Sequence, residues 1–445
     1  MFMYNQKIIL SLFIVLFGGF FHKVYSSSLV DIDNAESYVI LSNRSPIHVP
    51  YNKIFSQLNP KQLLVIFPKE TATEDQIDQL KELYGELMPV GDYLSSGNVE
   101  WEIMRLANRH PVRKIIALSE PDVLRAAEFR DFLKITGQSY HDALAFRDKI
   151  IMKEYVARAG IKVPRYATAK CVVDVLEFGS KIGFPIVIKP SRGTGSMNTY
   201  VLKSNNSNQW PETLKNSFSC DHYSEFVVEE FIDGPLYAVN GIVKEGQLIA
   251  AWPSKYIGTN LGFLFGKSFG NYILEHSNPE VAKLNMYAES ILNSLPKLVD
   301  GVFHLELFEN KGDYVFCEIA ARTAGGHHRQ EWISAFDIDM GLHHLIGQAG
   351  LSVSKKMNLP LMPMTIPSFL YIPPQPGTLV QVPDSCPFPW VKEYKVNYEV
   401  GMSMGSAKYS CDPLAYIFLE SDSEEQAKER LMAVSSWFES NTIIE

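Results

Sequence analysis

The first third of the chain alternates short apolar runs with polar stretches of helical periodicity. Apolar runs that end at breakers such as Pro68 are typical of strands. Strands that alternate with helices predict βαβ units and a parallel sheet. We therefore expect an N-terminal parallel α/β domain over residues 31–140. Its predicted strands are 38–41, 63–67 and 114–118, and its predicted helices are 74–84 and 122–133.

The pattern then changes to one amphipathic helix followed by short strands joined by glycine-containing turns. The helix is predicted over 148–159, with Asp148 as its N-cap and Ile151, Tyr155 and Val156 on its apolar side. Glycine-containing turns between apolar runs indicate antiparallel hairpins. The predicted strands are 186–189, 199–202, 226–230, 238–243, 247–252, 302–308 and 314–319, with turns at 244–246 and 311–313.

The end of the chain begins with a proline-rich stretch after Gly350 and closes with a helical pattern over 423–438. A chain of 445 residues corresponds to about three domains. We expect an α/β (α+β) protein in which a middle domain over 141–345 follows the N-terminal domain. A C-terminal α+β subdomain over 346–445 completes it.

Composition and charge narrow the class of protein. Hydrophobic residues make up 46% and charged residues 20%, which excludes a disordered or collagen-like chain. The net charge is −9, and no run of Lys or Arg stands out. Since a duplex-binding protein usually needs a basic face for the phosphates, nucleic acid is not an expected partner. The five cysteines are widely spaced and predict neither a disulfide framework nor a zinc knuckle.

The N-terminal segment, residues 1–30, has the order of a signal peptide. Lys7 precedes an apolar run over 8–21, and small residues follow at 26–28. The apolar run has 14 positions, fewer than the ~20 that a membrane-spanning helix needs. Three alternatives stay open: a cleaved signal peptide, a membrane anchor through residues 7–23, and a misassigned start codon.

Two of the predicted strands set a pair of glutamates face to face. If the loop is 311–313, Asn310 pairs with Tyr314, and the same register sets Glu306 opposite Glu318. Directly opposed side chains have Cβ atoms about 5 Å apart, where like charges repel unless a cation lies between them. Mg²⁺ suits this place because it binds carboxylate and phosphate oxygens. The alternative is a solvated hairpin face, although apolar neighbours indicate that the other face of both strands is covered.

A glycine-rich loop lies between the predicted strands 186–189 and 199–202. It reads Lys189-Pro-Ser-Arg-Gly-Thr-Gly-Ser196 and lacks the Gly-Lys-Ser/Thr ending of a P-loop. Its glycines let backbone N–H groups approach a phosphate, its hydroxyls can donate, and Lys189 lies at its base. The loop is either a phosphate cradle or an ordinary surface loop.

A third feature is an apolar strand that carries two acids and then ends in a turn. It reads Phe226-Val-Val-Glu-Glu-Phe-Ile-Asp-Gly234. The backbone of such a hinge can bind the edge of an adenine, and a carboxylate can bind ribose. An edge strand with exposed acids explains the same pattern equally well.

In their order along the chain, these stretches resemble the ATP-grasp superfamily of carboxylate–amine ligases, over most of the chain after the N-terminal segment. Two parts look most like the L-amino-acid ligase and carnosine-synthase-like branch. They are the stretch Glu318-Ile-Ala-Ala-Arg322 with Gly325-Gly326, and a C-terminal third that begins Pro373-Pro-Gln-Pro-Gly377. The resemblance implies an ATP-grasp fold in the middle domain. The matching motifs are Arg147-Asp-Lys149, Ala159-Gly-Ile-Lys-Val-Pro164, Gly183-Phe-Pro-Ile-Val-Ile-Lys189, Val228-Glu-Glu-Phe-Ile232, His304-Leu-Glu306, Glu318-Ile-Ala-Ala-Arg322 and Gly325-Gly326.

The resemblance also implies a role for each matching residue. Two lysines would hold the ATP phosphates, one glutamate the ribose, and the hinge backbone the adenine. The implied catalytic groups are Arg322, facing the transferred phosphoryl group, and Lys189. The implied ligands of Mg²⁺, which Mn²⁺ can replace, are Glu306 and Glu318. The implied ATP-binding residues are Lys149, Lys189, Ser191, Gly193, Thr194, Gly195 and Ser196, then Glu229 for ribose and Glu230 and Ile232 for adenine.

Two positions depart from the family pattern. Ala320 stands where many members have an asparagine that helps to ligate metal. Leu236 stands near the place of a glutamate that commonly follows the hinge. These departures put a second metal ion and tight nucleotide binding in doubt.

Three basic residues after Gly326 are candidates for the acceptor pocket: His327, His328 and Arg329. A cation there would meet a substrate carboxylate. The alternative is that one of them caps a helix that begins near Gln330. A zinc site is disfavoured, because adjacent histidines do not share a face and no Cys or carboxylate completes a ligand set.

The resemblance implies an ATP-dependent ligase that joins a small carboxylic acid to an amine, both expected to be amino acids. The acid would be activated as an acyl phosphate, with release of ADP and phosphate. A ligase for a different amide and a nucleotide-binding protein without turnover are the alternatives. The oligomeric state is open. The location is open too, because the N-terminal segment favours export or membrane attachment and ATP chemistry favours the cytoplasm.

Overall fold

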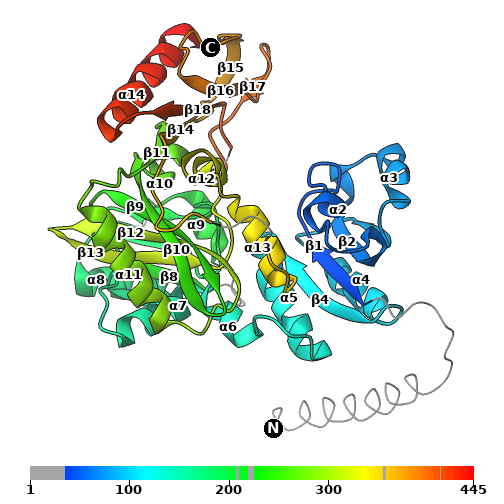
Figure 1. Cartoon of the computed structure of the whole chain (residues 1–445). Coiled ribbons are helices and arrows are strands. Elements are labelled where there is room, and N and C mark those ends of the chain that lie inside the picture. Colours follow the sequence, from blue (N-terminus) through cyan, green and yellow to red (C-terminus); the bar gives the residue numbers. More distant parts are fainter. Residues whose placement is uncertain (1–35, 207–209, 219–224, 354–356, 411) are drawn as a thin grey trace. The chain divides into compact units, whose positions relative to one another are not determined.

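The structure is a computed structural model that describes residues 36–206, 210–218, 225–353, 357–410 and 412–445 (Figure 1). The predicted signal or anchor segment lies outside the described residues. Ser37–Glu445 forms one compact unit. In the described ranges, no helix combines the length and the apolar character needed to cross a membrane.

The N-terminal domain is built on a parallel sheet of order β3-β2-β1-β4, as the alternating pattern predicts. Strand β3 and helices α2, α4 and α6 were not predicted. β3 pairs only with β2, is half-buried and contains Pro89, so it lacks the apolar run of an inner strand. The elements are β1 Ser37–Leu41, α2 Tyr51–Ile54, β2 Leu63–Pro68, α3 Glu74–Lys81, β3 Glu86–Val90, α4 Asn98–Ala107, β4 Val112–Ala117, α5 Glu120–Leu133 and α6 Tyr140–Ala145.

A four-stranded antiparallel sheet of order β5-β8-β6-β7 carries the glycine-rich loop and the acidic hinge. The loop joins β6 to β7, which confirms the predicted hairpin. Strand β8 lies between β5 and β6, so the edge-strand alternative for the hinge is wrong. The elements are α7 Lys149–Arg158, β5 Tyr166–Ala169, α8 Val172–Ile182, β6 Ile186–Pro190, β7 Tyr200–Leu202, α9 Glu212–Ser217 and β8 Phe226–Glu230.

The largest sheet has eight strands in the order β13-β12-β9-β10-β11-β14-β18-β16. Its last three strands come from the predicted C-terminal subdomain, which therefore extends the sheet of the middle domain. The predicted boundary at residue 345 falls inside helix α13 (Met340–Gln348), whose Leu345 and Ile346 pack on the N-terminal domain. The strands are β9 Leu236–Lys244, β10 Gln247–Ile257, β11 Phe269–Ile273, β12 Gly301–Asn310, β13 Asp313–Ala320, β14 Ile366–Ile372, β16 Val391–Val396 and β18 Ala415–Ser421.

Helices cover this sheet, and a small sheet of order β17-β15-β19 lies at the end of the chain. The closing helix begins after Ser423, one residue after the predicted start, and the Ser423 side chain accepts from the Gln426 N–H. The remaining elements are α10 Asn260–Leu264, α11 Glu280–Ser294, α12 His328–Phe336, α13 Met340–Gln348, β15 Gly377–Gln381, β17 Ser403–Met404, α14 Glu424–Asn441 and β19 Ile443–Ile444.

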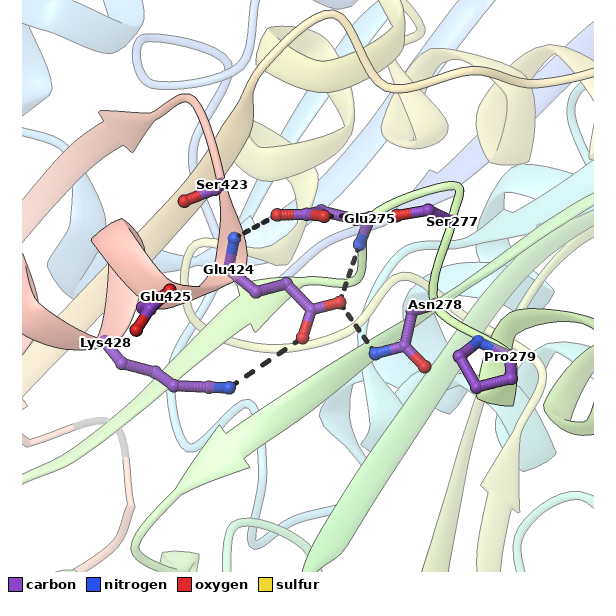
Figure 2. Close-up of a pocket in the computed structure, with 8 residues that line it drawn as sticks. All are labelled: Glu275, Ser277, Asn278, Pro279, Ser423, Glu424, Glu425 and Lys428. Carbon is purple, nitrogen blue, oxygen red and sulfur yellow. Dashed lines mark hydrogen bonds and ion pairs between the residues drawn. The ribbon is translucent and has the colours of Figure 1, made fainter.

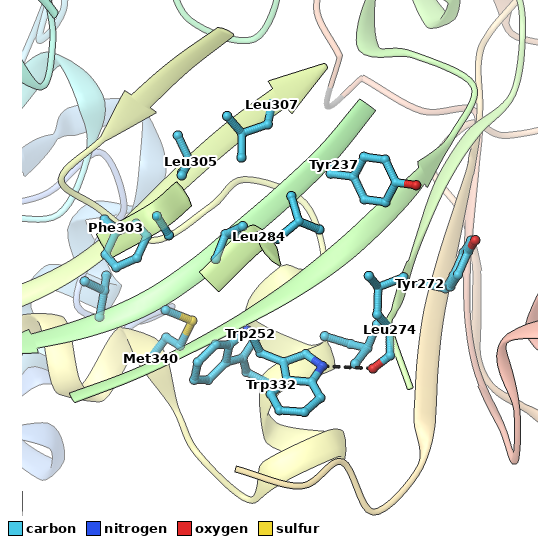
Figure 3. Close-up of a cluster of buried hydrophobic side chains, with 14 of the residues drawn as sticks. Tyr237, Trp252, Tyr272, Leu274, Leu284, Phe303, Leu305, Leu307, Trp332 and Met340 are labelled. Carbon is cyan, nitrogen blue, oxygen red and sulfur yellow. Dashed lines mark hydrogen bonds between the residues drawn. The ribbon is translucent and has the colours of Figure 1, made fainter. Parts of the chain in front are cut away.

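The main hydrophobic core fixes which side of β12 faces the functional groups. Leu305 and Leu307 are fully buried in the same cluster as Leu284 of α11 (Figure 3). Because successive side chains of a strand alternate between faces, His304 and Glu306 point to the opposite face. The predicted covering of one face of this strand is therefore confirmed.

Helix α14 is tied to the loop after β11 by reciprocal capping. The Glu424 N–H donates to Glu275 Oε1 at 2.6 Å, and the Glu275 N–H donates to Glu424 Oε1 at 2.9 Å (Figure 2). Asn278 Nδ2 also donates to Glu424 Oε1, at 2.7 Å. Glu275 and Glu424 line the surface pocket drawn in Figure 2. Each accepts a backbone hydrogen bond from the other, so both have a structural role in the fold.

Candidate active site

Glu306 and Glu318 lie opposite each other in the β12–β13 hairpin, as the sequence predicts, but the turn and the register differ from the prediction. The turn is Lys311-Gly312, two residues with φ of 55° and 82°, and Asn310 pairs with Asp313. The predicted three-residue loop is therefore wrong, and positive φ at both positions fits a type I′ turn. A bulge between Glu306 and Leu307 then shifts the register by one residue and sets Glu306 opposite Glu318.

A buried lysine lies against this bulge. Lys153 of α7 is fully buried, and its Nζ donates to the Cys317 carbonyl oxygen at 2.8 Å. Cys317 is the extra residue of the bulge, because Leu307 pairs with Phe316 and Glu306 with Glu318. A bulge leaves ladder groups unpaired, so the Lys153 ammonium supplies the partner that the strand loses.

Lys153 also reaches the acidic hinge, where Glu229 lies between two lysines. Glu229 Oε2 is 3.1 Å from Lys153 Nζ, and Glu229 Oε1 is 2.6 Å from Lys189 Nζ. Burial alone would raise the pKa of Glu229, but the two ammonium groups outweigh burial and lower it. Burial likewise acts to lower the pKa of Lys189, and Glu229 reverses this and raises it. Both groups are therefore charged at neutral pH.

The N-terminus of α7 holds the glycine-rich loop. The Lys149 N–H donates to the Ser191 carbonyl at 2.9 Å, and Lys149 Nζ donates to the Gly193 carbonyl at 2.8 Å. The same ammonium lies 3.3 Å from Glu318 Oε2. The Gly195 carbonyl accepts from the Ser410 N–H at 3.0 Å. Lys149 thus joins the loop to the glutamate pair, and the C-terminal part of the chain holds the loop tip.

A glutamate from the N-terminal domain neutralises the predicted catalytic arginine. Glu120, at the start of α5, accepts from Arg322 Nε and lies 3.4 Å from Arg147 Nε. Arg322 Nη1 donates to the Thr323 carbonyl at 2.8 Å. Burial would raise the pKa of Glu120, but the two arginines outweigh it and lower the pKa. Arg322 is therefore fixed by an ion pair that crosses from one domain to the other.

These groups together form a dense cluster of paired charges between β6, β8, α7 and the β12–β13 hairpin. A family model described as ATP-grasp domain matches residues 182–331, which include the loop, the hinge and the hairpin.

Residues 182–331 of the chain are an ATP-grasp domain.

Known ATP-grasp proteins are similar to it over most of its length. An L-arginine-specific L-amino acid ligase of Bacillus subtilis is 26% identical over 332 residues, which cover 71% of this chain and 77% of the relative. Dapdiamide A synthase of Enterobacter agglomerans is 26% identical, over 52% of this chain and 55% of that protein. The crystal structure of an L-amino acid ligase from Bacillus licheniformis superposes with a TM-score of 0.68 at 16% identity, covering 93% of this chain and 100% of that one.

These similarities confirm the predicted family, fold class and class of enzyme. The chain is an ATP-dependent carboxylate–amine ligase with an ATP-grasp fold. The roles of single residues stay predictions. The structure shows only which groups surround each of these residues.

The residues implied for phosphates and metal converge, and the glutamate implied for ribose is paired with two lysines. Lys149, Lys189 and the loop lie around one site with Glu318 and Arg322. Each oxygen of Glu229 lies near a lysine, so a ribose hydroxyl would share this carboxylate with two ammonium groups. The Glu230 N–H donates to the Arg165 carbonyl at 2.8 Å. The backbone groups that stay candidates for the adenine contact are therefore the Glu230 carbonyl and the Ile232 backbone.

The three predicted acceptor-pocket residues all have other partners. His327 packs in an aromatic cluster, 4.5 Å from the Tyr416 ring, and burial lowers its pKa to about 4. The lowered pKa disfavours the charged form that the predicted role as a cation requires. His328 is buried against Glu331, and Arg329 pairs with Asp339 through two 2.6 Å contacts. Helix α12 begins at His328, close to the predicted Gln330, but His327 makes no side-chain cap.

The donor set fits a divalent cation of the Mg²⁺ type. Glu306 is 6% exposed, so the solvated-face alternative is wrong for this residue. Two opposed carboxylates match the one or two that Mg²⁺ takes together with phosphate oxygens. Ala320 lies opposite His304 and offers no oxygen as a third ligand. Across the ranges that the structure describes, no group of three or more His, Cys, Asp or Glu residues forms a metal site.

Several residues of the site were not identified from the sequence. Lys153 lies four residues after Lys149 on the same helix, a spacing that shares a face, but the apolar pattern was assigned to Ile151, Tyr155 and Val156. The buried face is instead Lys149, Met152, Lys153 and Val156. Glu120 gave no signal, because only the tertiary structure brings α5 beside Arg322.

Proposed function

We propose that this ligase couples two amino acids, activating the carboxylate of one for attack by the amino group of the other. The observation that carries the proposal is the convergence of Lys149, Lys189, Arg322 and the Glu306–Glu318 pair from separate elements of the chain. The curated relative that covers 71% of the chain is an L-arginine-specific L-amino acid ligase, which supports amino acids as the substrate class.

The chemical problem is that a carboxylate repels a nucleophile and has no leaving group. Transfer of a phosphoryl group from ATP solves both parts, because an acyl phosphate is an electrophile with a good leaving group. Lys149 and Lys189 place fixed positive charge at the phosphates, and Arg322 faces the group that moves. Such preorganised charge stabilises a transition state without reorganisation of solvent.

Mg²⁺, which Mn²⁺ can replace, would be held by Glu306 and Glu318 and would supply charge neutralisation at the phosphate oxygens. The protein itself orients the reactants and excludes water. The glycine-rich loop covers the phosphates, and its contacts with Lys149 and Ser410 hold it in place. The covered site protects an acyl phosphate from hydrolysis until the amine arrives.

The products test this proposal. With both substrates present, ADP and phosphate should form in proportion to the amide, whereas adenylation of the acid would give AMP and pyrophosphate. We expect slow release with the acid alone, since the acyl phosphate then has no amine to attack it. The measurement is a screen of amino-acid pairs, L-arginine included, by mass spectrometry of the amide and chromatography of the nucleotides.

Two results would contradict the proposal. Steady formation of AMP with the amide would show a different activation. ADP formation that does not respond to any acid or amine would favour a nucleotide-binding protein with residual hydrolysis.

A further inference from the structure

Glu306 is held by one carboxylate oxygen only. Tyr256 Oη donates to Oε1 at 3.0 Å, Asn260 Nδ2 lies 3.4 Å from the same oxygen, and His304 Nε2 also lies at 3.4 Å. In the part of the chain that the structure describes, Oε2 has no such contact. The carboxylate is therefore anchored on one side and presents its other oxygen to the site.

Tyr256 is the first member of a buried chain of hydrogen bonds. Its Oη lies 3.1 Å from His328 Nε2, and His328 Nδ1 lies 2.9 Å from Glu331 Oε2. Tyr256, His328 and Glu331 are 6%, 3% and 0% exposed. The rings are held by edge contacts, Tyr256 against His328 at 5.7 Å and His328 against Phe369 at 5.2 Å. Packing thus fixes the orientation of both rings.

Counting hydrogens gives the chain a direction. A hydroxyl has one hydrogen, and an ionised carboxylate only accepts, so Tyr256 donates to Glu306. His328 Nε2 must then carry a hydrogen and donate to Tyr256 Oη. One further proton lies between His328 Nδ1 and Glu331, and the pair is neutral overall whichever atom carries it. Burial favours the protonated acid, since it raises the pKa of Glu331 against the opposing effect of His328.

We propose that Glu331, His328 and Tyr256 are positioning residues that orient Glu306 and keep its Oε2 directed to the metal. The inference rests on the proposed function, because it assumes a metal–nucleotide site at Glu306. It assigns His328 a place behind the metal ligand, in contrast to the acceptor-pocket role predicted from the sequence. Groups that orient a metal ligand in this way typically change metal affinity by 10- to 100-fold when they are altered.

The test measures metal binding without turnover, by electron paramagnetic resonance titration of Mn²⁺ in the presence of ADP. We expect Tyr256→Phe, which keeps the ring and removes the hydroxyl, to weaken Mn²⁺ binding about ten-fold. Glu331→Met should do the same. Glu331→Gln should recover most of the loss, because its amide can donate to Nδ1 and leave the Nε2 hydrogen in place.

A matched control is available on the same hairpin. Tyr287 Oη donates to Asp313 at the turn end of β13, so Tyr287→Phe removes a tyrosine–carboxylate bond away from the metal pair. We expect it to bind Mn²⁺ as the unaltered protein does. Thermal unfolding of each variant shows whether it is folded.

The outcomes separate the inference from the function on which it rests. If the unaltered protein binds no Mn²⁺ with ADP, the proposed metal site fails and the inference fails with it. If the unaltered protein binds Mn²⁺ and folded Tyr256→Phe binds it equally well, the positioning chain alone is overturned. Equal losses in Tyr256→Phe and Tyr287→Phe would also overturn it, as would a Glu331→Gln variant as weak as Glu331→Met.

Discussion

Glu318→Gln should lower ligase turnover by about a hundred- to a thousand-fold while the fold survives. Burial would raise the pKa of Glu318, but Lys149 and the neighbouring lysines lower it well below the usual range, so the side chain is charged at neutral pH. Glutamine keeps the volume and removes this charge from the proposed metal pair. A loss of metal-held charge stabilisation of about 3–4 kcal/mol corresponds to the stated range. Steady-state kinetics of ADP release measures it.

The control for this variant lies three residues from the other member of the pair. Glu309 is on β12, and its Oε1 accepts from the Gly312 N–H at 2.7 Å, a contact that Glu309→Gln can keep. We expect Glu309→Gln to have nearly unchanged turnover. Equal loss of activity in both variants would exclude the cross-strand metal site. Circular dichroism and thermal unfolding establish that both variants are folded.

Lys153→Met should have the largest effect on stability among single changes in the site. It removes a fully buried ammonium that contacts Glu229 and the Cys317 carbonyl. Removal of one partner from a buried ion pair typically costs about 3–5 kcal/mol. We expect the lower end, because Lys189 still pairs with Glu229. Urea denaturation measures the free energy of unfolding.

The same change should also reduce activity in the folded protein, since the bulge that sets Glu306 opposite Glu318 loses its donor. Lys162→Met is the matched control: Lys162 pairs with Asp313 at the exposed end of the same hairpin, and its side chain is 63% exposed. We expect little change there. Adding Glu229→Gln to Lys153→Met should lower stability further, because buried Lys189 then loses its partner. The total loss should be smaller than the sum of the two single losses, because both single changes remove the Lys153–Glu229 contact. A double variant with strictly additive losses would contradict the pairing.

Local patterns were sufficient to predict part of the fold. Apolar runs and turn residues located β1, β2, β4, the β6–β7 hairpin and the closing helix, because each depends on burial of its own residues and on nearby breakers. Strand β3 was missed because an edge strand with Pro89 and half-buried side chains has no such run. The boundary at residue 345 was placed inside α13, whose apolar residues pack against two different cores.

For the Glu306–Glu318 pair, the sequence led to the right neighbours through two errors that cancel. The turn is one residue shorter than predicted, and the bulge at Cys317 adds that residue back. The turn length depends on the φ values of Lys311 and Gly312, and the bulge depends on a donor from α7. Neither can be inferred from the residues of the hairpin alone. The opposition of the two glutamates became certain only with the tertiary structure.

The sequence by itself predicted the family, the fold class and the class of enzyme, because its motifs and their order along the chain resemble those of the ATP-grasp superfamily. Only the tertiary structure decided the partners of these groups. Lys153 contacts Glu229 and Cys317 from far along the chain, and Glu120 reaches Arg322 from another domain. His328, predicted to meet a substrate carboxylate, is instead buried and contacts the Glu331 carboxylate and the Tyr256 hydroxyl. Ion pairs and hydrogen-bond chains between distant segments depend on how whole elements pack, and no local pattern encodes that packing.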